Sequence, residues 1–143
     1  MITIVCGLGL AGLGFDGPPE TGTIRLNVTQ LRSDRGRVSV SLYRSKDGFP
    51  SNAARSFKTV RASIQGGKSE VVFADVPAGE YAVALMHDEN DNNRLDTHWT
   101  GLPKEGYGVS NNARAALGPP RYADAKFRLE KPGVQLEIKV RYL

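Results

Sequence analysis

Hydrophobic and polar residues alternate along most of the chain beyond Pro19, and a period of two predicts β-strands with one buried face. Residues 23–31 and residues 37–44 both show this pattern, with apolar positions at Ile24, Leu26, Val28, Val38, Val40 and Leu42. The turn sequence SDRG separates the two segments. We therefore expect them to pair as a β-hairpin.

The same periodicity predicts further strands along the chain. They cover residues 58–64, 69–76, 81–87, 124–130 and 134–143. Residues 81–87, YAVALMH, are apolar on both faces, which predicts a central strand that is covered on both sides. About seven short strands joined by turns predict an all-β fold, a single antiparallel β-sandwich of the prealbumin-like or Ig-like kind.

Two interruptions of the strand pattern are expected to hold short helical turns. The first follows Ser51, which we expect to cap a turn reaching Ala54, and the second follows Ser110 as its cap. The second lies inside the connection 87–122, which shows no convincing strand. Such a long connection is usually functional or disordered. Because it carries aromatic residues among its polar ones, we expect one long ordered loop and place the function there.

Residues 1–19 are expected to form a signal-peptide-like leader and linker, ahead of a β-sandwich domain over 20–143. Residues 2–15 are apolar apart from Thr3, and small residues allow cleavage after Ala11 or Gly14. The sequence GLGLAG at 7–12 matches a dinucleotide-binding fingerprint, but FDGPPETG follows and would break the required helix. The leader predicts a secreted or periplasmic protein with no transmembrane segment in its mature form.

Charge narrows the choice of partners. The formal net charge is +4, and the basic residues are scattered rather than gathered among aromatic ones. This distribution argues against nucleic-acid binding. A basic surface suits anionic envelope components, so a polysaccharide, a lipid or another protein remain open as partners. The single cysteine, Cys6, lies in the leader, so we expect a mature domain without disulfides.

The segment HDENDNNRLD, residues 87–96, predicts a calcium-type loop at 88–96. Oxygen-bearing residues occupy alternate positions, as in the first part of an EF-hand loop. The predicted ligands are Asp88, Asn90, Asn92, the carbonyl of Arg94, and Asp96, with Glu105 as a later carboxylate. Trp99 stands where an EF-hand has its bidentate Glu. The alternative is an Asx-rich turn in which side chains bond their own backbone. In either case Glu89 and Asp91 are expected to face solvent.

Aromatic and histidine side chains near the acidic segment are the other candidate site residues. His87 and His98 flank it and suggest either acid–base chemistry or backbone hydrogen bonding. Trp99 and Tyr107 suggest stacking on a sugar ring or packing of the loop on the sandwich. We group these four residues as candidate ligand-binding positions.

Residues 74–127 closely resemble the bacterial family called Domain of Unknown Function 2141. The family pattern has a Pro-Gly-x-Tyr-Ala strand, then His-Asp-x-Asn-x-Asn and an Asp, then Gly-x-Pro-x-Glu-x-Tyr-Gly and Ser-Asn-Asn. Here these motifs fall at residues 77–82 (with one extra residue), 87–96, 101–108 and 110–112. Asn93 stands where relatives usually carry Gly. The resemblance implies an exported bacterial protein with a small β-sandwich, similar to prealbumin-like and collagen-adhesin B-type modules, and implies no activity.

Two functional hypotheses follow. The first is a non-enzymatic, exported binding or structural module whose long loop is ordered by calcium. The second is a transthyretin-like hydrolase that uses His87 and His98. Transthyretin-like enzymes that hydrolyse 5-hydroxyisourate end in Tyr-Arg-Gly-Ser. This chain ends in VRYL, which argues against the second hypothesis.

Overall fold

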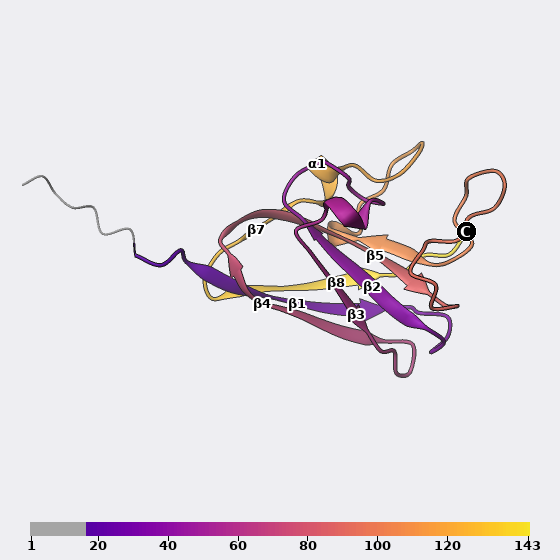
Figure 1. Cartoon of the computed structure of the whole chain (residues 1–143), viewed down its shortest axis with the longest axis horizontal. Helices are drawn as coiled ribbons and strands as arrows, with labels where there is room; N and C mark the ends of the chain where they lie inside the picture. Colours follow the sequence, from indigo (N-terminus) through magenta and orange to yellow (C-terminus); the bar gives the residue numbers. More distant parts are fainter. Residues whose placement is uncertain (1–16) are drawn as a thin grey trace, which may run out of the picture.

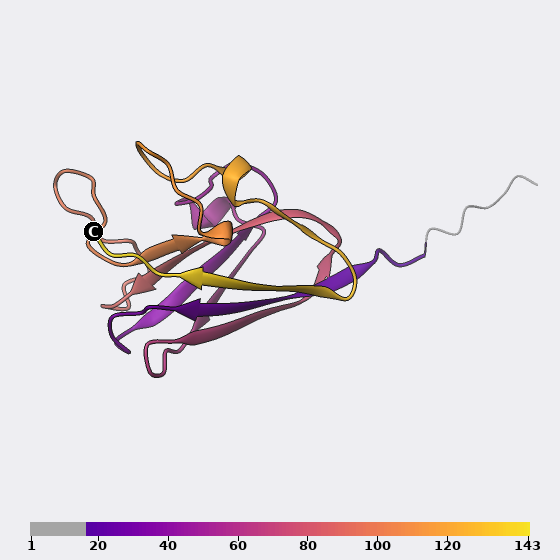
Figure 2. The same ribbon diagram turned by 180° about the vertical axis from the view of Figure 1, so that it is seen from behind.

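A computed structural model describes residues 17–143 and contains two β-sheets packed face to face (Figures 1 and 2). Sheet A has the strand order β4-β1-β8. Sheet B has the order β3-β2-β5-β6, and β7 pairs with the other end of β5. The elements are β1 (Thr21–Thr29), β2 (Arg37–Tyr43), η1 (Ala53–Arg55), β3 (Lys58–Ala62), β4 (Ser69–Pro77), β5 (Gly79–Asp88), β6 (Tyr107–Val109), η2 (Ser110–Asn112), α1 (Tyr122–Ala125), β7 (Phe127–Leu129) and β8 (Gly133–Lys139).

The predicted buried faces are confirmed. The alternating apolar residues of β1 and β2 point into one core between the sheets, where they meet Phe73 of β4, Leu129 of β7 and Ile138 of β8. All of these side chains are fully buried. Burial of apolar side chains of this size stabilises the fold by about 1.5–3 kcal/mol each. The chain is therefore mostly β, as predicted, and two-layered.

The predicted pairing of the first two strands is wrong. β1 pairs with β4 and β8, whereas β2 pairs with β3 and β5 in the other sheet. Alternation fixes which face of a strand is buried, but it does not fix the neighbouring strand. The pairing is also not wholly antiparallel, because β1 and β8 run in the same direction, in register from Thr23–Gly133 to Thr29–Lys139.

β5 is central and covered on both sides near its start, as its two apolar faces predicted. Its inward side chains join the main core, while Ala82 and Ala84 on the outer face are buried under a second apolar cluster. That cluster contains Tyr43, Phe49 and Tyr122, whose rings meet edge to face. Towards its end β5 loses this cover, and Met86 is only half-buried.

The connection after β5 is ordered, and it contains more structure than predicted. Three residues form β6, which pairs with β5 from Ala84–Val109 to Met86–Tyr107. The predicted helical turn at Ser110 exists as η2, but the Ser110 side chain does not cap it. The hydroxyl instead accepts a hydrogen bond from the Val83 N–H (2.9 Å) and donates one to the Ala125 carbonyl (2.5 Å). Likewise, Ser51 caps nothing, because η1 starts after Asn52 and has no side-chain cap.

The predicted leader, including Cys6, lies outside the described residues except for residues 17–19. Within residues 17–143, no helix has both the length and the apolar character needed to cross a membrane.

Candidate functional site

Asp88 ends β5 and is completely buried. Its carboxylate accepts hydrogen bonds from the backbone N–H groups of Asn92 (3.1 Å) and Asn93 (2.8 Å), and from the Arg61 guanidinium (3.0 Å). Asn93 has a φ of 63°, a left-handed conformation that asparagine tolerates better than most residues. Asp88 therefore folds the loop back on itself, as an Asx-rich turn would.

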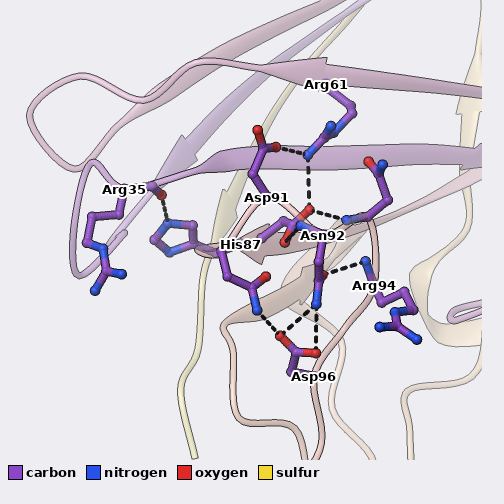
Figure 3. Close-up of polar contacts among 10 residues, drawn as sticks. Arg35, Arg61, His87, Asp91, Asn92, Arg94 and Asp96 are labelled. Carbon is purple, nitrogen blue, oxygen red and sulfur yellow. Dashed lines mark hydrogen bonds and ion pairs between the residues drawn. The ribbon is translucent and has the colours of Figure 1, made fainter.

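Asp96 is bonded by two of the three asparagines of the loop, and Figure 3 shows the contact with Asn92. Its carboxylate accepts hydrogen bonds from the Nδ2 atoms of Asn90 (2.6 Å) and Asn92 (2.9 Å). The Oδ1 of Asn92 accepts a hydrogen bond from the Arg94 N–H (2.9 Å). These hydrogen bonds, with the Asn92 amide first, hold the pKa of Asp96 below its ordinary value.

Glu105 approaches Asp96 from the far end of the loop and is only 5% exposed. Burial, together with the charges of Asp96 and Asp88, raises the pKa of its carboxyl to about 7. The buried Oε2 atom has no hydrogen-bond partner among the described residues. A buried oxygen without a partner is costly and requires an explanation.

The predicted ligand set is therefore brought together in part. Asn90, Asn92, Asp96 and Glu105 share one small region, whereas the Asp88 carboxylate is already occupied by the loop backbone and Arg61. Over residues 17–143, no three His, Cys, Asp or Glu side chains are grouped so that they could hold a metal ion. A cation here would thus need amide oxygens beside the two carboxylates.

Glu89 and Asp91 were both expected to face solvent. This is wrong for Glu89, and Asp91 is exposed but also forms an ion pair. The Glu89 side chain is 15% exposed and forms an ion pair with Arg32. Asp91 is more exposed and pairs with Arg61, which also binds Asp88. Arg32 and Arg61 thus both fasten the acidic loop to neighbouring segments of the chain.

The two histidines lie in different environments. His87 is fully buried, and its ring nitrogens lie 2.7 Å from the Tyr142 hydroxyl and 2.7 Å from the Arg35 carbonyl. The carbonyl can only accept, so Nε2 carries the proton and Nδ1 accepts from Tyr142. His98 is exposed in the turn before Leu102. These contacts leave His87 without a ring nitrogen for acid–base chemistry and give the hydrolase hypothesis no support.

The two aromatic candidates, Trp99 and Tyr107, also lie in different environments. Trp99 is 97% exposed at the tip of the 97–103 loop. Tyr107 is half-buried on β6 and lines a groove on the outer face of sheet B. Trp99 is not among the residues that line this groove.

The groove has a volume of about 720 Å³, within the usual range for small-molecule sites. The floor of the groove is the outer face of sheet B. The strand register sets Ser39, Met86 and Tyr107 side by side across β2, β5 and β6. The next row is Ser41, Ala84 and Val109. The walls come from four parts of the chain: Pro50, Ser51 and Ala53; residues 93–95, Thr97 and residues 101–103; residues 118–120; and Leu143.

The loops around residues 100 and 117 both stand off the same side of the sandwich (Figures 1 and 2). The acidic loop therefore serves also as a wall, because Asn93, Arg94 and Leu95 line the groove. Sequence reasoning missed this groove. The available signal was the small residues Ser39 and Ser41 on β2 and Ala84 on β5, since short side chains on one face leave a sheet surface hollow.

The geometry defines a class: a two-layer β-sandwich with a hydrogen-bonded acidic loop beside an open groove. Residues 26–137 match the family described as "Uncharacterized protein conserved in bacteria (DUF2141)", and the chain belongs to this family. No curated protein and no solved structure matches the chain. The resemblance seen in the sequence is thus confirmed, while a specifically prealbumin-like or Ig-like topology is not.

Proposed function

We propose that this protein is an exported, non-enzymatic binding module whose acidic loop is organised by a calcium-type cation. Glu105 is the observation that carries the proposal. A buried carboxyl with an unpartnered oxygen lies against a second carboxyl, and the two repel each other when both are ionised. A bound divalent cation would remove the repulsion and give the oxygen a partner.

The chemistry of the neighbouring groups supports an oxygen-liganded cation. Asp96 and Glu105 would supply carboxylate oxygens, and Asn90 and Asn92 would supply amide oxygens. Turning each terminal amide by half a revolution exchanges its nitrogen and oxygen. This breaks the hydrogen bonds that the two Nδ2 atoms donate to Asp96 and the one that the Arg94 N–H donates to Asn92 Oδ1. Asp88 would act through its charge, and the Arg94 carbonyl is a further oxygen of the loop.

Few carboxylates imply weak binding, in the ~10⁻⁴–10⁻³ M range of extracellular calcium modules. Such an affinity suits a compartment in which calcium is abundant, and this agrees with export. The apolar residues 2–15 and the bacterial family support a secreted or periplasmic location.

Thermal unfolding with calcium and with a chelator tests the cation. A site of ~1 mM affinity that exists only in the folded state should stabilise by about 1.4 kcal/mol at 10 mM calcium. We expect the unfolding midpoint of the natural protein to rise by a few degrees. Equal midpoints in calcium and in chelator would refute the cation.

Glu105→Gln provides the sharpest variant. It removes the buried charge but keeps the shape of the side chain, so we expect an equal or higher midpoint in chelator and no response to calcium. Glu70→Gln is the matched control, because Glu70 is an exposed residue on β4 whose loss leaves the calcium response intact. A calcium response that survives in Glu105→Gln would place the ion elsewhere.

A further inference from the structure

The groove on the outer face of sheet B has a composition that indicates its ligand. We propose that it binds a single-chain amphiphile with one anionic head group, of the long-chain fatty acid type. The apolar tail lies along the floor formed by β2, β5 and β6, and the head group lies at the β6 end. This inference rests on the proposed binding role but not on the cation.

Two of the four hydroxyl groups on the floor are already engaged, which leaves those of Ser39 and Tyr107 for a ligand. The Ser41 hydroxyl is engaged with that of Thr59 (2.9 Å), and the Tyr43 hydroxyl donates to the Pro50 carbonyl (3.2 Å). Ala84, Met86 and Val109 supply apolar surface between them. A sugar would require several free polar partners in such a site, whereas an alkyl chain requires only apolar contact and exclusion of water.

The charged side chains that line the groove and the crevice beside it are all basic. Arg94 is the one charged side chain among the residues that line it. A small crevice of about 10 Å³, room for one water molecule, adjoins the groove at Tyr107, Gly108, Val109 and Pro120. Lys139 and Arg141 also line it, together with Asn112 and Ala113. A head group would therefore lie outside the crevice, against these two cations. Among the described residues, neither Lys139 nor Arg141 forms an ion pair with a carboxylate.

A third cation strengthens the anion preference of this crevice. Burial first, and then the like charge of Arg114, lower the pKa of Arg141. Two neighbouring guanidinium groups repel each other unless an anion lies between them. Arg141 also donates to the Asn112 carbonyl (2.9 Å), which fixes its position at the mouth of the crevice. A carboxylate or phosphate head group would satisfy this charge.

The rim of the groove is unusually apolar for a protein surface. Trp99, Leu117 and Leu143 are 97%, 93% and 71% exposed, and Leu102, which lines the groove, is 54% exposed. Trp99 and Leu117 lie within two residues of groove-lining positions. Exposed apolar groups that border a cavity are typical of a binding site.

Calorimetric titration of the full-length protein with free fatty acids of eight, ten and twelve carbons, below their micelle concentrations, tests whether the groove binds the alkyl tail. Each buried methylene should tighten binding about fourfold until the groove is full. An affinity that does not change with chain length would overturn the proposal. So would binding to anionic phospholipid vesicles without binding to free fatty acid, because a bilayer surface would then be the partner.

Variants test the two ends of the ligand. Ser39→Phe fills the floor and should weaken dodecanoate binding at least tenfold at an unchanged unfolding midpoint. Val72→Phe adds the same ring to the exposed face of sheet A and should bind as the natural protein does. Equal affinities of the two variants for dodecanoate would show that the fatty acid does not bind in the groove.

Arg141→Gln should weaken dodecanoate binding about tenfold, and Arg141→Lys should restore most of it. Lys68→Gln, in the turn before β4, makes the same charge change at a distance and serves as the control. A larger effect from Arg94→Gln than from Arg141→Gln would overturn the placement of the head group.

Repeating the titration in calcium and in chelator separates the two proposals. Fatty acid binding in chelator, with no calcium shift in the unfolding midpoint, would leave the groove assignment standing and refute the cation. A calcium shift without fatty acid binding would do the reverse.

Discussion

At the scale of single residues, buried polar side chains in this protein serve the backbone of neighbouring segments. Asp88 binds two N–H groups of its own loop, His87 binds the Arg35 carbonyl, and Ser110 joins β5 to α1. Each such bond satisfies a backbone group that is withdrawn from water. The long connection after β5 is therefore held in place by hydrogen bonds from a few buried residues rather than by a large core of its own.

Ser110→Ala tests this role. The substitution leaves the Val83 N–H and the Ala125 carbonyl without their side-chain partner in a buried position. We expect a loss of about 1–3 kcal/mol in the free energy of unfolding, measured by urea denaturation. Ser63→Ala, at an exposed position, should change this quantity by less than about 0.5 kcal/mol. Similar small losses for both variants would contradict the role of Ser110.

At the scale of secondary structure, the short connections carry the chain from one sheet to the other. β1 leads to β2, β3 to β4, and β4 to β5, and each step changes sheet. The first step passes Gly36, which has a φ of 67° and lies against the end of β5. An added Cβ at this position would lie 1.9 Å from the Asp88 carbonyl oxygen, which is a backbone atom.

Gly36→Ala is therefore expected to destabilise the protein by about 2 kcal/mol or more, because left-handed strain and the backbone clash act together. Gly66→Ala is the matched control: Gly66 has a φ of 61°, and a Cβ there meets no atom within 4 Å. Chemical denaturation of both variants measures the difference. Equal losses would mean that the close approach to Asp88 contributes nothing.

Local sequence patterns predicted most strands but not their arrangement. The alternation of β1, β2 and β4 and the continuous apolar run of β5 are local features of the sequence, so they can be recognised without a structure. Sheet membership depends on which distant strand is available, which explains the mistaken hairpin and the unforeseen parallel β1–β8 pair. β6 has only three residues, too few for a period to be recognised.

At the scale of the whole molecule, the alternation between sheets makes the two layers one cooperative unit. The sheets cannot separate without exposing the apolar core that lies between them and pulling on the short segments that join them. The functional site, too, could be predicted only as far as it lies within one segment of the chain. The Asp and Asn spacing of one loop was visible in the sequence, but the groove gathers three strands and several loops, so no local motif marks it.

Native-state hydrogen exchange tests this cooperativity. Leu26 lies in the middle strand of sheet A, and Val40 lies between β3 and β5 in sheet B. We expect their amides to exchange with the same free energy of opening, equal to the global value. An opening of sheet A that costs over about 1 kcal/mol less than that of sheet B would show that the layers unfold separately.

The parallel pairing of β1 and β8 has a geometric consequence for tethering. The chain enters the sandwich at one pole and leaves it at the opposite pole, and Leu143 and the acidic loop share the second pole (Figure 1). A circular permutant would need a bridge along a strand of seven to nine residues, about 23–30 Å. A protein immobilised through residue 17 would present its acidic loop away from the support.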